Sequence, residues 1–429
     1  MPSGGVIVLA RVRPGKEEEL FLFLNRLGND INGRELATSH RAPRIEFRNS
    51  HTIHFARLAL MDDPDSGAGR KRLLVTTDFD GPLEAHVREL LALTTDSLAI
   101  WGCCEDYGGG ADFAAFLDRN RIEPATYYLA FRGDNLPRIR DARELREVFC
   151  ALLAAPGNEA LRAELSGRLR LLGWIRRAWR RVAAPVLFIM HMFAGLKEIP
   201  RLRRQFGWAH LLLAGRQITA TLGRIPWIRL INSILGNGAQ PPTARFSQAS
   251  PWTPARLMTR EHPPEDTILQ NQLTLVTDVR AEELPRQKAV LAIINHYARR
   301  LATPGNLVGI STIHTVRWAL IDGGRRLLMV SNYDGSWENY IDEFAEMILS
   351  GLNALWSSAP DFPQAGAADV PAFKQFLRTH QVPANVFYSA YPQTSVLNLK
   401  QDLEFQTWNG WLLRGLPTPA TRLPAASVA

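Results

Sequence analysis

The sequence has little cysteine and none of the motifs that mark several common enzyme classes. Its 429 residues include only three cysteines: Cys103, Cys104 and Cys150. Three thiols, two of them adjacent, give neither a disulfide framework nor a zinc-binding spacing, and they fit a reducing compartment. The sequence has no nucleophile elbow, phosphate-binding loop, dinucleotide-binding glycine pattern or paired-histidine zinc motif. Hydrolase, kinase and nicotinamide-dependent classes are therefore disfavoured.

Long apolar runs are also missing. A bilayer-spanning helix takes roughly 20 apolar residues. The longer of two candidates, residues 182–196, is bounded by Arg181 and Lys197 and is interrupted by a proline, a histidine and a glycine. No charged-then-apolar leader precedes the first predicted strand. We therefore expect a cytoplasmic protein that does not cross the membrane.

Acidic residues are almost absent from one segment. Residues 165–231 contain thirteen arginines and lysines but a single acid, Glu198, which gives this segment a net charge of +12. The whole chain carries +8, so the remainder carries −4. The same segment holds Trp174, Trp179, Trp208 and Trp227. All the excess positive charge therefore lies in one tryptophan-containing insert.

Such a composition is typical of helices that lie in the headgroup region of a bilayer, where each basic side chain contributes about 1 kcal/mol near anionic lipid. The sequence predicts an anionic membrane surface as a partner of the insert. An insert that packs on the protein and leaves its arginines solvated is the alternative. We expect no nucleic acid, because the aromatic residues lie among aliphatic ones. The predicted membrane-binding residues are Trp174, Arg176, Arg177, Trp179, Arg180, Arg181, Arg203, Arg204 and Trp208.

The sequence on either side of the insert is duplicated. The segment TIHFARLAL at residues 52–60 returns as TIHTVRWAL at residues 312–320. Residues 73–81 then match residues 327–335, and three further matches follow in the same order. An ordered series of this kind indicates two copies of one structural unit.

Each copy predicts strand, helix, strand, strand, helix, strand. The two middle strands of the second copy are separated by Asp322-Gly323-Gly324, which is a strong hairpin signal. After the second of these strands, Trp337, Tyr340, Ile341, Phe344 and Ile348 follow at helical spacing. This order is the ferredoxin-like βαββαβ unit.

The repeated polar residues are the candidate site. His54 and Arg57 are three apart on a predicted strand, as are His314 and Arg317, so simple alternation places the two members of each pair on opposite faces. A repeated histidine is either a hydrogen-bonded core residue or a ligand facing a pocket. Asp80 and Asp334 each follow a strand and precede a helix, which also suits a cap of that helix.

Two βαββαβ units in one chain resemble the dimeric α/β barrel superfamily, which includes dye-decolourising peroxidases, chlorite dismutases and antibiotic-biosynthesis monooxygenases. The segment from Ser331 to Ser336 is similar to the peroxidase motif of Gly, two residues and Asp-Gly, with Ser331 in place of the first glycine. The resemblance implies haem as cofactor. It implies iron ligation by His314, with His296 and His54 as further cofactor-binding candidates, and catalytic roles for Asp334, Arg317, Asp80 and Arg57.

The predicted fold is α+β, with two ferredoxin-like repeats that form an intramolecular dimeric α/β barrel split by a basic helical insert. The predicted boundaries are residues 1–145, 146–268 and 269–412, followed by a disordered tail at 413–429. The predicted function is a peripheral membrane oxidoreductase of haem peroxidase-like type that acts on a hydrophobic or lipid-derived substrate. A non-catalytic barrel that binds an apolar ligand or acts as a scaffold is one alternative, and a cofactor-free monooxygenase is another. A homo-oligomer is left open.

Overall fold

The fold comes from a computed structural model. It describes residues 3–31, 45–94 except 68, 100–171 except 169, residue 174, residues 203–204, and residues 268–412 except 301. The predicted tail and most of the predicted insert, including Arg176, Arg177, Trp179, Arg180, Arg181 and Trp208, therefore lie outside the described residues.

The two halves have matching elements in the same order. Those of the first half are β1 (Ser3–Arg11), α1 (Glu17–Ile31), β2 (Ile53–Asp62), β3 (Lys71–Asp80), α2 (Leu83–Leu93), α4 (Phe113–Arg119), β4 (Arg121–Ile122), β5 (Thr126–Leu129) and α5 (Leu136–Ala154). Those of the second half are β6 (Gln270–Asp278), α9 (Leu284–Arg300), β7 (Ile313–Ile321), β8 (Arg326–Asp334), α10 (Trp337–Trp356), α11 (Val370–Thr379), β9 (Val386–Ser389) and α12 (Val396–Leu412).

The described residues have an α+β structure with two antiparallel sheets. One has the strand order β4-β1-β3-β2-β9 and the other the order β5-β7-β8-β6. The strand β9 belongs to the second half but pairs with β2, with Arg57 opposite Phe387. Conversely, β5 belongs to the first half but pairs with β7, with Arg317 opposite Tyr127. Each sheet is therefore completed by a strand from the other half of the chain.

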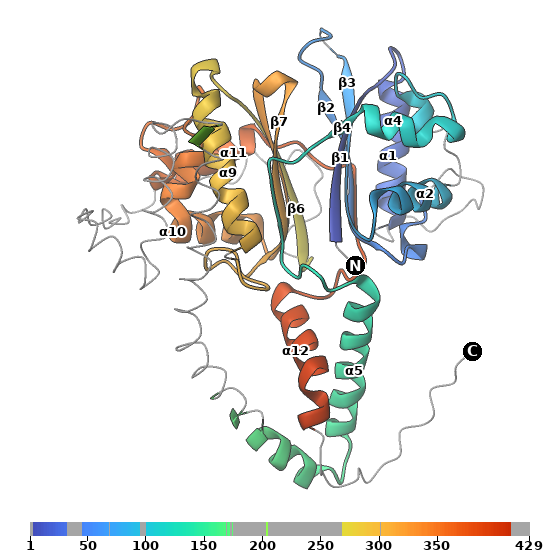
Figure 1. Ribbon diagram of the computed structural model, residues 1–429, viewed down its shortest axis with the longest axis vertical. Coiled ribbons are helices and arrows are strands. Elements are labelled where there is room, and N and C mark those ends of the chain that lie inside the picture. Colours follow the sequence, from blue (N-terminus) through green and yellow to red (C-terminus); the bar gives the residue numbers. More distant parts are fainter. Residues whose placement is uncertain are drawn as a thin grey trace.

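Both faces of each sheet are covered. The helices α1, α2 and α4 lie on the outer face of the first sheet, and α9, α10 and α11 lie on that of the second (Figure 1). Strands covered on both sides become apolar at successive positions, as in Leu73-Leu74-Val75. The inner faces pack together through an aliphatic cluster made of Ile7, Leu9, Ala59, Met61, Leu74, Ala319, Ile321, Leu328 and Val330.

The hairpin predicted between the middle strands of the second half is confirmed. Asp322–Gly324 joins β7 to β8, and Gly323 has φ 67°, a left-handed conformation that glycine adopts without a steric penalty. Of the five apolar residues predicted at helical spacing, Trp337, Tyr340, Ile341 and Phe344 are buried on α10, whereas Ile348 is half-buried and has non-helical backbone angles.

The helices α5 and α12 lie beside each other, outside the two sheets, and both run away from the end of the sheets where β2 and β7 begin (Figure 1). We call this helix pair the stalk. The boundary predicted at residue 145 falls inside α5, because Leu136–Ala154 is one continuous helix. The first half of the chain therefore continues into the stalk without a break.

Candidate functional site between the two sheets

Two arginines cross the space between the sheets in opposite directions. Arg57, on β2, donates to the carbonyl oxygens of Leu273 and Ser331 at 3.0 and 2.7 Å. Arg317, on β7, donates to the carbonyl oxygen of Val6 at 2.8 Å and forms an ion pair with Asp78. Each arginine is 1% exposed. The two guanidinium groups therefore link the backbones of the two sheets.

A close approach at β1 requires glycine beside one of these groups. A Cβ atom at Gly5 would lie 3.0 Å from Cζ of Tyr127 and 3.1 Å from Cζ of Arg317. The hydroxyl of Tyr127 also donates to Asp78, at 2.7 Å. Gly5 thus leaves room for the Arg317, Asp78 and Tyr127 side chains to meet.

The duplication is broken at one charged position. Asp78 and Asn332 are equivalent residues of β3 and β8. Across the interface between the sheets, Nδ2 of Asn332 lies 3.5 Å from Oδ2 of Asp78. Arg57 donates to the Asn332 side chain at 2.5 Å and to the Thr274 hydroxyl at 2.7 Å, so these acceptors, like the two carbonyl oxygens, are neutral. Burial, and then the like charge of Arg317, lower the pKa of Arg57 to about 9. Asp78 is thus the carboxylate adjacent to both arginines.

Beyond the arginines lies a second polar layer of repeated His–Asp pairs. Nε2 of His54 is 3.0 Å from Asp80, and Nε2 of His314 is 2.7 Å from Asp334. Each aspartate also accepts a hydrogen bond from the first backbone N–H of a stalk helix. Asp80 accepts from Leu136 of α5, and Asp334 from Val396 of α12, both at 2.7 Å.

These bonds correct the predicted role of the two aspartates. Asp80 and Asp334 were expected to cap the helices that follow them directly, yet α2 has no side-chain cap and α10 is capped by Ser336. The helices that the aspartates stabilise are α5 and α12, which begin 56 and 62 residues further along the chain. Negative charge at a helix N-terminus is favourable. The two pairs therefore fasten the stalk to the sheets.

One tyrosine joins the two histidines. The hydroxyl of Tyr391 is 3.1 Å from Nδ1 of His54, and its ring centroid is 6.1 Å from that of His314. Burial, followed by the nearby aspartates, raises the pKa of Tyr391 well above its ordinary value. We therefore assign the hydroxyl as the donor to Nδ1 and the His54 Nε2–H as the donor to Asp80. The equivalent residue of the first half, Phe131, has no hydroxyl.

A β-bulge invalidates the alternation argument for His54 and Arg57. The pairing of β2 with β3 shifts between Ile53 and Phe55, and that of β7 with β8 shifts between Ile313 and Thr315. The extra residue in each strand is the histidine. Because a bulge resets the side-chain direction, each histidine lies on the inner face together with its arginine. The prediction of opposite faces was therefore wrong.

The remaining predicted site residues do not join this layer. His296 is half-buried on α9, which covers the outer face of the second sheet. Trp174 is 63% exposed, and Arg203 and Arg204 are exposed. The structure thus brings together His54, Arg57, Asp80, His314, Arg317 and Asp334, and it leaves His296 apart.

The residues of this layer do not fit a haem. Nε2 of His314 is engaged by Asp334 at 2.7 Å and is therefore not free to ligate iron. The Phe55 ring centroid lies 5.4 Å from the His314 ring, and Tyr391 packs on the same histidine. Within the described ranges, no cluster of three or more histidine, cysteine, aspartate or glutamate residues is placed to hold a metal ion.

Sequence reasoning missed the residues that connect the predicted ones. Asp78 and Asn332 lie two positions before Asp80 and Asp334 on the same strands, so the period of a strand places them on the same face. That signal was available. Tyr391 gave no comparable signal, because its contact with His54 joins residues 337 positions apart.

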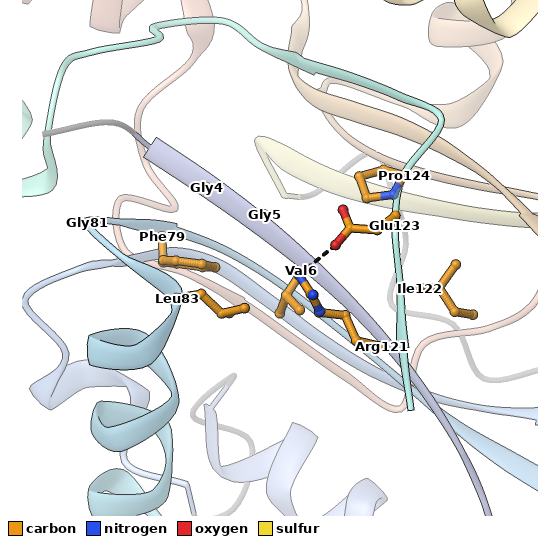
Figure 2. A pocket seen from close by; sticks show the side chains of 10 residues that line it. All are labelled: Gly4, Gly5, Val6, Phe79, Gly81, Leu83, Arg121, Ile122, Glu123 and Pro124. Carbon is orange, nitrogen blue, oxygen red and sulfur yellow. Dashed lines mark ion pairs between the residues drawn. The ribbon is translucent and has the colours of Figure 1, made fainter. Parts of the chain in front are cut away.

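A groove lies elsewhere, at the edge of the first sheet. It has a volume of about 180 Å³, and Arg121 and Glu123 form an ion pair of 2.6 Å at its rim (Figure 2). In the second half, Trp337 replaces Leu83 of this groove, and the Arg378 guanidinium lies 3.6 Å from its ring centroid. None of the predicted catalytic or cofactor-binding residues lines the groove. Its lining residues are Gly4, Gly5, Val6, Phe79, Gly81, Leu83, Arg121, Ile122, Glu123 and Pro124.

Comparison with known proteins gives no family. No family description matches the chain, and neither a curated protein nor a solved structure matches it. Of the helices in the described part of the chain, none has both the length and the apolarity needed to cross a membrane.

Proposed function

We propose that this chain is a non-catalytic scaffold that holds a basic insert against an anionic membrane surface in the cytoplasm. Its two halves would be ferredoxin-like repeats that pair as an intramolecular dimeric α/β barrel. One observation carries the proposal. The buried arginines, histidines and aspartates that could perform chemistry instead bond one half of the chain to the other, or bond the sheets to the stalk.

This reading replaces the peroxidase-like hypothesis. A peroxidase-like site needs a histidine that faces a cofactor cavity, with arginine or aspartate on the opposite wall. Here His54 and His314 are each 2% exposed and bonded to aspartate. A cofactor-free monooxygenase needs a polar pocket, and the polar layer between the sheets is packed with the Phe55 and Tyr391 rings. Both enzyme readings therefore receive less support than a scaffold.

The membrane part of the proposal rests on charge. The +12 segment carries tryptophans and short apolar stretches, which suits adsorption to anionic lipid headgroups. The described chain on either side of it forms a folded body with both sheets covered by helices. A folded body attached to a basic segment is the arrangement expected of a peripheral scaffold.

Vesicle co-sedimentation of the full chain tests this function. We expect binding to phosphatidylcholine vesicles that contain phosphatidylserine, little binding to pure phosphatidylcholine, and release as salt rises above about 0.1 M, where the Debye length is about 10 Å. A folded His54→Gln/His314→Gln variant should bind equally well. If the protein binds neither kind of vesicle, the proposed membrane role is wrong. A Soret band in protein made with ample haem would contradict the non-catalytic reading.

A further inference from the structure

The stalk has a defined register between its two helices. The Arg146 guanidinium of α5 forms an ion pair with Asp402 of α12, whose side chain is 1% exposed. One turn further along, the Phe149 and Phe405 ring centroids lie 4.8 Å apart. An ion pair to a buried carboxylate, combined with an aromatic contact, favours one alignment of two helices over others. The two helices therefore extend together, as one unit.

The stalk also has a defined direction. Both helices begin at the His–Asp layer, where Asp80 and Asp334 accept their first N–H groups. The 19 residues of α5 make it about 28 Å long at 1.5 Å per residue. Its far end is therefore well separated from the sheets, as Figure 1 shows.

Exposed apolar side chains gather along the chain that leaves this far end. Residues 159–168 form a helix that follows α5, and Leu165 of that helix packs with Phe149. Leu171 and Trp174 then follow, with 49% and 63% of their surface exposed. A tryptophan beside an exposed leucine is a combination suited to the interface between water and lipid.

The strongest run of positive charge begins with the next residues of the sequence. Arg176, Arg177, Arg180 and Arg181 follow Trp174 directly, and Arg414 follows the last residue of α12 within two positions. Exposed apolar groups that are followed in the sequence by positive charge are complementary to anionic lipid. The opposite end of the sheets, where β2 ends at Asp62, combines acidic and basic side chains in ion pairs.

We infer that the far end of the stalk is the membrane attachment point, with Leu171 and Trp174 entering the headgroup region of an anionic bilayer. This inference rests on the proposed function and adds an orientation to it. The stalk holds the two sheets away from the lipid, and the β2–β3 turn faces the aqueous phase.

Site-directed fluorescence tests the orientation. In a Cys150→Ser background, a polarity-sensitive thiol dye is placed at Leu171→Cys or at Asp62→Cys. Cys103 and Cys104 are buried, and burial raises the pKa of Cys104 to about 12, so neither competes for the dye. With phosphatidylserine-containing vesicles, we expect a blue shift and quenching by nitroxide lipid at position 171, and neither change at position 62.

The outcomes separate this inference from the function on which it rests. Vesicles that sediment with protein while the dye at position 171 stays unchanged would overturn the orientation and leave the membrane role intact. Absence of sedimentation would defeat the membrane role itself. Equal responses at positions 171 and 62 would also overturn the orientation.

A matched pair of variants gives a second readout. Leu171→Ser/Trp174→Ser should weaken binding to anionic vesicles about tenfold, because two apolar anchors are lost. Phe21→Ser/Leu22→Ser removes apolar side chains that are 46% and 49% exposed on α1, a helix that lies on the outer face of the first sheet, and it should leave binding unchanged. If the α1 variant weakens binding and the stalk variant does not, the attachment point lies elsewhere.

Discussion

At the residue scale, the balance of charge between the sheets depends on a single carboxylate that lies next to both buried arginines. Arg317 pairs directly with Asp78, whereas Arg57 meets the amide of Asn332 at the equivalent position. Removal of one partner from a buried ion pair leaves an uncompensated charge, which is more costly than replacement of the whole pair. The difference between Asp78 and Asn332 should therefore be visible in stability.

Asp78→Asn should lower the free energy of unfolding by about 3–5 kcal/mol, because both arginines then lack an adjacent carboxylate. Urea denaturation of the variant and the parent protein measures this difference. Asp78→Asn/Asn332→Asp is the matched control, since it moves the carboxylate to the equivalent position beside Arg57 and keeps one carboxylate between the sheets, and we expect it to cost less. An equal or larger loss for the control would show that charge compensation is not what Asp78 supplies.

Sequence reasoning found most of these residues but misassigned their relations. The repeats identified His54, Arg57, His314 and Arg317 because each occurs twice at the same place. Their common face could not be predicted, since it depends on a bulge at each histidine. A bulge depends on how two strands pair and leaves no mark in the spacing of either strand alone.

At the scale of elements, a stacked pair of rings fixes α2 on the first sheet and α10 on the second, but the residues that form the pair differ between the two halves. In the first half, the His86 ring stacks on Phe79 at 3.8 Å, and its Nε2 lies 2.7 Å from the Thr77 hydroxyl. In the second half, Tyr340 stacks on Tyr333 at 3.9 Å. Its hydroxyl lies 2.6 Å from that of the residue equivalent to Thr77. Of these two stacked residues, only His86 can take up a proton at acidic pH.

Burial lowers the pKa of His86 from 6.5 to about 4. As the pH falls from 6.5 towards 4, the unfolded chain binds a proton that the folded protein does not, so stability present above pH 6.5 is lost. The loss approaches about 3 kcal/mol at 1.36 kcal/mol per pKa unit. His86→Tyr should keep the stack and remove this part of the pH dependence, as measured by urea denaturation at pH 7 and pH 4.5.

The second half supplies the control for that experiment. Tyr340→His places an imidazole in the equivalent buried stack, so its stability should fall more steeply than that of the parent between pH 7 and pH 4.5. The account of His86 is wrong if His86→Tyr and the parent lose stability equally over this range.

Most of the elements could be predicted because their signals are local. Strand patterns, the Asp322–Gly324 turn and the apolar face of α10 all follow from residues close together in sequence. The pairing partners of β5 and β9 could not be predicted from the sequence. Strand β9 has the same local pattern whether it completes its own sheet or the other one, and only tertiary packing decides between them.

At the scale of the whole molecule, the exchange of β5 and β9 makes the stability of each sheet depend on both halves of the chain. Val386 of β9 is fully buried in the core of the first sheet, although it lies more than 300 residues from β2 in sequence. Arg57 and Arg317 also connect the two sheets, because each donates hydrogen bonds to carbonyl oxygens of the opposite sheet. We therefore expect the two sheets to unfold as one cooperative unit.

Hydrogen exchange of a Val386→Asp variant tests this claim most directly. A buried, unpaired carboxylate in β9 should destabilise the first sheet, so peptides from β1 and β3, which carry no substitution, should lose protection together with those from β6 and β8. Leu397→Asp is the control, because Leu397 is 55% exposed on α12, and it should leave all four strands protected. Full protection of β1 and β3 in the Val386→Asp variant would contradict the account, since it would mean that each half completes its own sheet.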